Sequence, residues 1–267
     1  MQWVLGAILI CTASLFASCS NADLPASGGE PVIDGLAEKV IGKWIVDQKE
    51  GKPALTNQKV VINFVSDSKV SVSVSFMNFW HHNDLFDYTI KRNTISCKKQ
   101  LDENTLAKIS VKVHAIEANA MNEDFFYSLS VDGKEQVRME SKEVLKRVTD
   151  DYSTAILGIW EGKVTSEEGS EFDDGETHRW EFRADGSYYF YSKVNDQWQL
   201  SDDDYGTYFV DGTLLCTRWK NKGENTVENR EWWEVESIEN GVMKWTALRQ
   251  KPDGTTYTAT FQMTKVN

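Results

Sequence analysis

Two stretches decide the fold: INFVSDSKVSV at 62–72 and WEFRADGSYYF at 180–190. The second follows the first by 118 residues and matches it in residue type. Both stretches alternate apolar and polar residues, and this period of two is typical of a β-strand with one buried face. The pair therefore predicts that one β-rich unit occurs twice in the chain.

Further matches occur in the same order along the chain at nearly the same offset, which favours a duplicated unit over coincidence. We therefore expect one domain at 36–148 and a second at 149–267. The matching pairs are Ile-Gly-Lys-Trp at 41–44 with Leu-Gly-Ile-Trp at 157–160, Cys97 with Cys216, IEANAM at 116–121 with IENGVM at 238–243, and Asp132-Gly133 with Asp253-Gly254.

Strand patterns and turn pairs fill both copies. KVSVSVSF at 69–76 places valines on one face and serines on the other, and KISVKVHAI at 108–116 alternates in the same way. Asp-Gly and Asn-Gly pairs, such as Asn240-Gly241, separate the runs and are typical of tight hairpins. Short helical turns are expected at 35–42 and 150–158. The pattern predicts an all-β chain with two tandem antiparallel up-and-down barrels of about eight strands each.

The N-terminal segment predicts export and anchoring. Residues 1–18 carry no charged side chain, and their apolar run is shorter than the roughly 20 residues of a bilayer span, so a signal peptide is expected. FASC at 16–19 resembles the bacterial lipobox, which implies lipidation of Cys19. Ser20 then resembles the signal for outer-membrane sorting. Residues 19–35 are small and polar and predict a flexible tether, so we expect a lipid-anchored protein of the cell envelope, periplasmic or surface-exposed.

The charge of the chain limits the classes of partner that it can bind. The net charge is −12, and residues 149–267 hold 23 Asp and Glu against 12 Lys and Arg. Such an acidic chain argues against a nucleic-acid partner and against electrostatic docking on anionic lipid, so we expect the protein to contact the membrane through its N-terminal lipid anchor alone.

Cys97 and Cys216 lie at matching positions of separate copies, and we expect two buried core residues rather than a disulfide.

A short turn, then Gly-x-Trp on the first strand, then a meander resembles the calycin superfamily, and specifically the lipocalin-like domains of bacterial lipoproteins. The resemblance implies a structural role for Gly42 and Gly158, which begin the two motifs. In lipocalins the tryptophan plugs the closed end of the barrel, and a cation from the last strand lies over it. Here Trp44 and Trp160 match the tryptophan. Arg147 is the matching cation of the first copy, and Lys265 takes its place in the second.

The second copy is rich in aromatic residues, with seven of the ten tryptophans. Aromatic rings either fill a small barrel or form the walls of a ligand pocket, and the sequence leaves both alternatives open. Trp232 and Trp233 must point to opposite faces of one strand, so one of them lies outside the barrel or at an interface. The residues expected to contact a ligand are Trp180, Trp198, Tyr208, Trp219 and Trp245.

The chain lacks the motifs of common enzymes and cofactor sites, so it is not expected to be an enzyme or to hold a cofactor. The acidic loop at 161–176 does not match a calcium loop, and His81 and His82 lack further ligands at zinc spacing, so no metal is expected. We expect noncatalytic binding of a small apolar, amphipathic or glycan-like ligand in the aromatic barrel. The alternative is a protein-interaction module in which both barrels are filled and the acidic, aromatic outer surface of the second recruits a partner.

Overall fold

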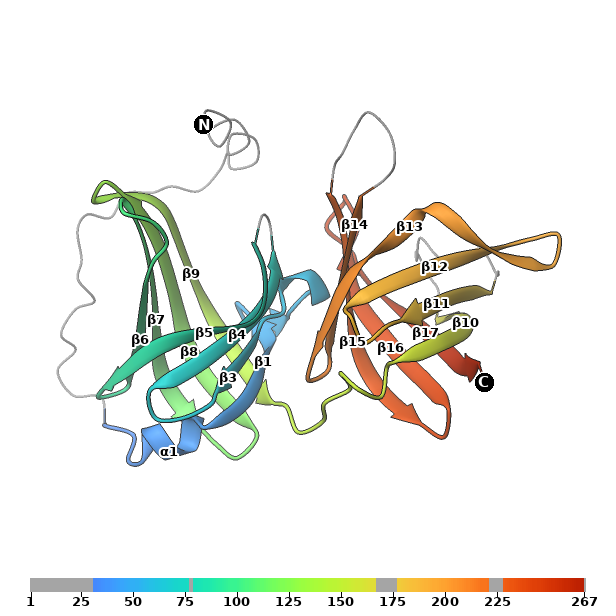
Figure 1. Cartoon of the computed structure of the whole chain (residues 1–267). Helices are drawn as coiled ribbons and strands as arrows, with labels where there is room; N and C mark the ends of the chain where they lie inside the picture. Colours follow the sequence, from blue (N-terminus) through green and yellow to red (C-terminus); the bar gives the residue numbers. More distant parts are fainter. Residues whose placement is uncertain (1–30, 77–78, 167–176, 221–227, 267) are drawn as a thin grey trace. The chain divides into compact units, whose positions relative to one another are not determined.

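The computed structural model describes residues 31–76, 79–166, 177–220 and 228–266. Residues 33–267 form one compact unit that contains two closed antiparallel β-barrels, one after the other along the chain (Figure 1). The predicted all-β class with two tandem up-and-down barrels is therefore confirmed. The predicted signal peptide and Cys19 lie outside the described residues. No helix among the described residues is long and apolar enough to cross a bilayer.

The first barrel has eight strands in which each strand pairs with the next one and β9 returns to β1. The two-residue strand β2 pairs with the end of β1. The elements are α1 (Leu36–Val40), β1 (Gly42–Lys49), β2 (Lys52–Pro53), the 3-10 helix η1 (Thr56–Gln58), β3 (Val61–Phe64), β4 (Lys69–Phe76), β5 (Phe79–Lys91), β6 (Thr94–Gln100), β7 (Thr105–Ile116), β8 (Ala120–Val131) and β9 (Lys134–Arg147).

The second barrel repeats this order, and β17 returns to β10. Its elements are β10 (Gly158–Ser166), β11 (His178–Phe182), β12 (Ser187–Val194), β13 (Gln197–Asp211), β14 (Leu214–Lys220), β15 (Glu228–Glu239), β16 (Val242–Gln250) and β17 (Thr256–Val266).

The turn pairs fall where the sequence predicts them. Asp132 and Gly133 join β8 to β9 with φ of 50° and 72°, and Asn240 and Gly241 join β15 to β16 with φ of 50° and 75°. Positive φ at both central residues is the requirement of the type I′ hairpin, which Asp, Asn and Gly tolerate best. These residues therefore fix the lengths of the strands that form the barrel walls.

A tryptophan closes one end of each barrel. Trp44 on β1 and Trp160 on β10 are fully buried. The indole N–H of Trp44 donates a hydrogen bond to the carbonyl of Val40 at 2.7 Å, and that of Trp160 donates to the carbonyl of Ile156 at 2.6 Å. Both acceptors lie in the helical turn that precedes the strand, so each turn pairs a polar atom that burial would otherwise leave without a partner.

A cation from the last strand covers each of these rings, which is the arrangement that the resemblance to lipocalins implies. The Arg147 guanidinium lies 4.1 Å from the centroid of Trp44 and also donates to three backbone carbonyls around the closed end. The Lys265 ammonium lies 5.1 Å from the centroid of Trp160. Gly42 has φ of +113°, and a Cβ there would lie 2.7 Å from Arg147 Nη1, so the close approach requires glycine.

Cys97 and Cys216 are free and buried, but they face opposite ways. Cys97 on β6 belongs to the interior of the first barrel, whereas Cys216 on β14 belongs to a cluster on the outside of the second. The strand starts, Thr94 and Leu214, lie 120 residues apart, and the cysteines lie 119 apart. A shift of one residue reverses the face of a strand residue, so the predicted match between the cysteines is wrong by one position.

The serine face of β4 is buried between the barrels. Ser71, Ser73 and Ser75 alternate with valines that face the interior of the first barrel, yet they too are inaccessible. The Ser73 hydroxyl donates to Asp211 Oδ2 at 2.5 Å, and the Ser75 carbonyl accepts the indole N–H of Trp232 at 2.5 Å. β4 is therefore covered on both faces.

Apolar residues of both barrels complete this interface. The prediction that one of Trp232 and Trp233 leaves the barrel interior is confirmed, because Trp232 packs in the interface and Trp233 in the second core. The buried residues of the interface cluster are Ile45, Val61, Phe209, Leu214 and Cys216.

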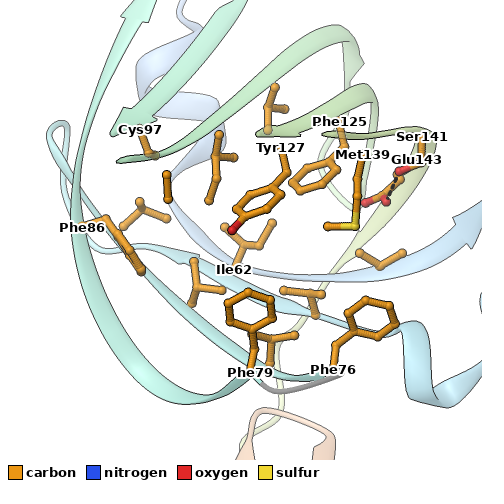
Figure 2. Close-up of a pocket in the computed structure, with 18 of the residues that line it drawn as sticks. Ile62, Phe76, Phe79, Phe86, Cys97, Phe125, Tyr127, Met139, Ser141 and Glu143 are labelled. Carbon is orange, nitrogen blue, oxygen red and sulfur yellow. Dashed lines mark hydrogen bonds between the residues drawn. The ribbon is translucent and has the colours of Figure 1, made fainter. Parts of the chain in front are cut away.

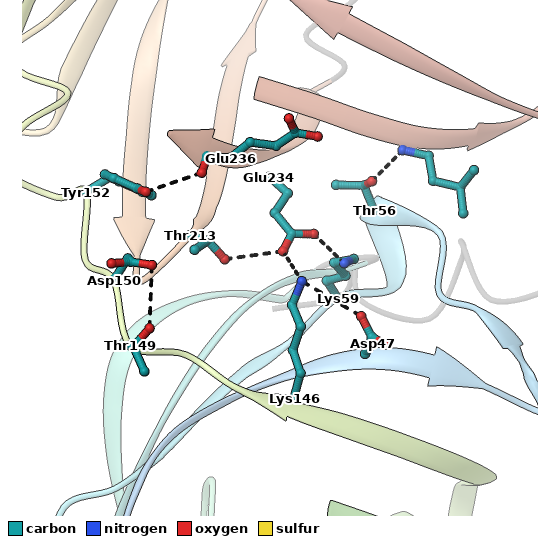
Figure 3. Close-up of polar contacts among 11 residues, drawn as sticks. Asp47, Thr56, Lys59, Lys146, Thr149, Asp150, Tyr152, Thr213, Glu234 and Glu236 are labelled. Atoms are coloured by element: carbon teal, nitrogen blue, oxygen red, sulfur yellow. Dashed lines mark hydrogen bonds and ion pairs between the residues drawn. The ribbon is translucent and has the colours of Figure 1, made fainter. Parts of the chain in front are cut away.

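One carboxylate of the second barrel pairs with two cations of the first (Figure 3). Glu234 on β15 pairs with Lys59 and, at 2.6 Å, with Lys146 of the first barrel, and it also accepts a hydrogen bond from Thr213 at 3.4 Å. Burial by itself would raise the pKa of Glu234, but the two ammonium groups outweigh it and hold the pKa below the ordinary value. The contact is therefore ionised at neutral pH.

We expect Arg147→Ala to lower the free energy of unfolding by about 2 kcal/mol, because a cation–π contact and three charged hydrogen bonds are lost. Lys265→Ala should cost less than about 1 kcal/mol, since an ammonium stacks less well than a guanidinium. Urea unfolding of the full chain measures both. Equal losses would contradict this account of the closed ends.

We expect Glu234→Ala to lower the free energy of unfolding by about 3 kcal/mol, because it leaves the buried Lys59 ammonium without its partner. Glu236→Ala is the matched control on the same strand. Its carboxylate pairs with Lys244 in a more exposed position, so it should cost less than about 1 kcal/mol. Thermal and urea unfolding compare the two variants, and a similar small loss in both would mean that the contact adds little.

Candidate functional site

The first barrel is hollow. Its interior contains a cavity of about 300 Å³ (Figure 2). That volume is at the lower end of the roughly 300–1,000 Å³ typical of ligand pockets. Most of the lining is apolar and comes from β1 and β3–β9, with aromatic rings at Phe64, Phe76, Phe79, Phe86, Phe125 and Tyr127.

The strand registers explain why the first barrel has this space. Trp44 pairs with Ile62 across β1 and β3, and Trp160 pairs with Trp180 across β10 and β11. Ile62 therefore occupies the position that Trp180 occupies in the second barrel. The two barrels share one framework at this level, and the aliphatic side chain fills less of it than the indole does.

The next strand repeats the substitution of aliphatic for aromatic side chains. Val70 pairs with Phe64 as Tyr188 pairs with Phe182. Two residues further along each strand, Val72 therefore lies at the position of Phe190. Together with Ile62, the first barrel has three aliphatic residues where the second has three rings.

The largest chemical difference between the two interiors lies on β8 and β9, which match β16 and β17 of the second barrel. Glu123 pairs with Glu143 across β8 and β9, and Trp245 pairs with Phe261 across β16 and β17. The neighbouring pairs align the two hairpins, because Met121 with Leu145 precedes the acids and Met243 with Met263 precedes the rings. Two carboxylic acids thus replace two of the largest side chains of the second core.

The rings of the second barrel pack against one another. Trp180 lies 5.5 Å from Trp245 at 81° and 5.3 Å from Phe261 at 86°, which are edge-to-face contacts. Trp233 stacks on Trp245 at 5.5 Å. Contacts of this kind stabilise a core beyond the area they bury. Among the described residues, these rings form a packed core in the second barrel.

The acid pair faces the cavity of the first barrel from its deep end. Glu123 is 2% exposed, and neither of its carboxyl oxygens has a hydrogen-bond partner among the described residues. Glu143 is 7% exposed, accepts a hydrogen bond from Ser141 at 2.5 Å, and lies 3.3 Å from the Lys49 ammonium. Figure 2 shows Ser141 and Glu143 together at one side of the cavity. Only one of the two acids is therefore satisfied by the protein.

Burial, together with the negative charges of Glu143 and Asp124, raises the pKa of Glu123 well above its ordinary value of 4.5. Glu123 therefore keeps its proton at pH values at which an exposed glutamate has lost it. As a neutral acid it offers one O–H donor and one carbonyl acceptor to whatever occupies the cavity.

The five residues predicted to contact a ligand lie in the second barrel and do not line this cavity. Trp180 and Trp245 are buried in the second core, and Tyr208 and Trp219 pack against it. Trp198 lies under the Arg179 guanidinium at 4.5 Å, on the outer face. Their role in ligand binding stays a prediction. The sequence analysis missed Glu123 and Glu143, although placing the two repeats in register would have exposed the exchange of rings for acids.

The histidines have protein partners. His81 lines the cavity near its mouth with Nδ1 2.5 Å from Asp84 Oδ2, and His82 stacks on Phe209 at 4.9 Å. The described residues contain no cluster of three His, Cys, Asp or Glu side chains that could bind a metal. Residues 167–176, most of the acidic loop, lie outside the described part of the chain.

No family model matches the chain, and no curated protein matches it. Solved structures with a similar path include two mutants of the vaccine antigen transferrin binding protein B from Haemophilus parasuis, both at 8% identity and a TM-score of 0.23. They cover 81% and 84% of this chain, which spans 56% and 74% of their lengths. A thioesterase II from Thermobifida fusca has 6% identity and a TM-score of 0.16, and the match covers 77% of this chain and 96% of that one. Scores this low carry no argument about fold or function.

We expect Glu123→Gln to change how stability depends on pH. A carboxyl with a raised folded-state pKa favours the folded chain fully below the unfolded pKa of about 4.5, and this contribution is lost as pH rises toward the folded pKa. The wild type should therefore lose stability more steeply than the variant as pH rises above 4.5. Urea unfolding across this range measures the slopes. Glu117→Gln, an exposed acid of the same barrel, is the control, and parallel slopes in wild type and Glu123→Gln would contradict the assignment.

Proposed function

We propose that this chain is a noncatalytic, lipid-anchored binding protein of the cell envelope that holds a small apolar or amphipathic molecule in its first barrel. The observation that carries the proposal is the cavity of about 300 Å³ inside a closed barrel whose twin is filled by aromatic rings. Residues 1–18 as signal peptide, 19–35 as tether and Cys19 as lipidation site belong to the same proposal, as does a place at the outer membrane. The domain limits 36–148 and 149–267 assign one barrel to each copy.

The comparison between the barrels supports a binding role for the cavity. The same framework is filled in the second barrel by large rings, so a filled interior is compatible with this backbone. Voids larger than a water molecule are rare in protein interiors and destabilise them. A hollow first barrel that retains this cost is therefore best explained by a ligand that occupies it.

The lipocalin-like family is part of the proposal. It is supported by the buried Gly-x-Trp tryptophans and by the cations of the last strands, Arg147 and Lys265, that lie over them. A catalytic role has less support, because the described polar groups of the cavity do not form a nucleophile with an adjacent base. Within the described ranges Glu123 lacks a hydrogen-bond partner, and Ser141 donates to Glu143, which is itself paired with Lys49.

We expect the double variant Ile62→Trp/Val72→Phe to abolish ligand binding, because it copies the ring-bearing positions of the second barrel into the first. Native mass spectrometry of the chain purified from envelope extract should detect a retained small molecule in the wild type and not in the variant. Trp198→Ala and Trp219→Ala test the aromatic second barrel as the binding site, and they should leave binding unchanged.

Overpacking can cost about 1–3 kcal/mol, so a second readout protects this test from a folding defect. Cys97 lines the cavity, and burial raises the pKa of its thiol to about 11. Its slow alkylation at alkaline pH should slow further when a ligand is bound, while the fully buried Cys216 serves as the internal control. A bare mass together with unprotected Cys97 in the presence of apolar probes would overturn the proposed function.

A second candidate function is recruitment of a protein partner by the outer face of the second barrel. Trp198 and the stacked pair Tyr189 and Tyr205 lie there, and Tyr205 is 49% exposed. Exposed aromatic surface of this kind is typical of contact sites. Such binding should weaken at high salt if the acidic charge contributes to it, because salt screens exposed charges.

A further inference from the structure

The deep end of the cavity has a strong excess of hydrogen-bond acceptors. Neither oxygen of Glu123 has a hydrogen-bond partner in the described part of the chain, and Glu143 uses one oxygen, Oε1, for both Ser141 and Lys49. The Ser141 hydroxyl proton is already donated to Glu143. The protein therefore supplies acceptors here that its own donors do not satisfy.

A buried carboxyl without a hydrogen-bond partner is costly for the protein, because its two oxygens lose their contact with water. The second barrel has Trp245 and Phe261 at the matching positions, where the buried polar atom without a partner among the described residues is the Trp245 indole nitrogen alone. The side chain of Glu123 points inward, because it shares one face of β8 with Met121, a buried residue of the first core, and with Phe125, which packs against that core. Its unpaired oxygens are therefore presented to the cavity rather than to solvent.

We propose that the ligand of the first barrel carries a protonated amine, or a similar cationic hydrogen-bond donor, at one end of an apolar body, and that Glu123 and Glu143 bind this end. The inference rests on the proposed function, since it names the class of ligand for the same cavity. An ammonium supplies up to three donors to the acceptors that lack partners. The apolar rings and aliphatic chains nearer the mouth contact the rest of the molecule.

The charge balance of the site supports a cation over an anion. When the ammonium enters, Glu123 gives its proton to solvent, so that one carboxylate faces the ligand and the other remains paired with Lys49. A ligand carboxylate in the same place would lie against two acids. Lys49 lies in register with Glu143 and is already paired with its carboxylate, and Lys99 lies over the Phe86 ring at 4.6 Å.

Three probes of nearly equal shape separate the alternatives: 2-phenylethylammonium, 2-phenylethanol and 3-phenylpropionate. Isothermal titration of the full chain at pH 7 should give the ammonium an affinity at least about tenfold above that of the alcohol, a difference of about 1.4 kcal/mol. The carboxylate should bind most weakly. Titration in buffers of different ionisation enthalpy should detect release of a proton on binding of the ammonium alone.

Glu123→Gln should reduce the affinity for the ammonium about tenfold and change that for the alcohol less than about twofold. Glu117→Gln makes the same substitution at an exposed position of the same barrel and should change neither affinity. A uniform loss for all probes in Glu123→Gln would indicate an altered cavity shape and would overturn the assignment of the acid.

The outcomes separate the cationic class of ligand from the more general ligand-binding function of the first barrel. Equal binding of the alcohol and the ammonium, or tightest binding of the carboxylate, would overturn the cationic ligand and leave a ligand-binding first barrel in place. Failure of all three probes to bind or to protect Cys97 would overturn the proposed function together with the inference. Preference for the ammonium with loss in Glu123→Gln supports both.

Discussion

The buried tryptophan at the closed end of each barrel is the contact on which the rest depends. Its ring is held by a hydrogen bond to the preceding turn and by a cation from the last strand, so it joins the first and last strands of the sheet. Both barrels then share the same pairing of β1 with β3 and of β10 with β11. Because the framework is the same, the identity of the inward side chains alone decides whether a barrel is packed or hollow.

The two barrels differ in how side chains fill this shared framework. In the second, Trp180, Trp245 and Phe261 meet edge to face and fill the interior. In the first, Ile62, Glu123 and Glu143 occupy the matching positions and leave a cavity with an acidic deep end. The packed barrel also contributes Asp211, Glu234 and Trp232 to the contacts that cover the outside of the hollow one. The packed second barrel thus stabilises the outer surface of the hollow first barrel.

Much of the fold could be predicted from the sequence, because period-two alternation and Asp-Gly or Asn-Gly pairs act locally. The faces of some residues could not be, since they depend on a register that one extra residue reverses. Cys216 is the clearest instance, and the buried serines of β4 are another, because only the neighbouring barrel covers them. The cavity could not be predicted for a related reason. Abundant rings in a sequence favour the second copy as the ligand site, whereas in the structure rings fill the interior and their absence leaves the cavity. The acids at Glu123 and Glu143 carry meaning only when the two copies are placed in register.

Both faces of β4 are in use, one toward the cavity and the other toward the second barrel. Val72, Val74 and Phe76 line the cavity on one side, and Ser71, Ser73 and Ser75 are sealed against the second barrel on the other. A wall packed on both sides cannot bow outward without separating the barrels, whereas β6 and β7 present exposed lysines such as Lys98 and Lys108 to solvent. We therefore expect the wall at β4 to yield less than the wall at β6 and β7. If the first barrel binds a ligand, as proposed, a molecule slightly too long or too wide would be accommodated on the side away from the second barrel. The size of ligand that such a barrel tolerates would then depend on which wall the extra atoms contact, as well as on the cavity volume.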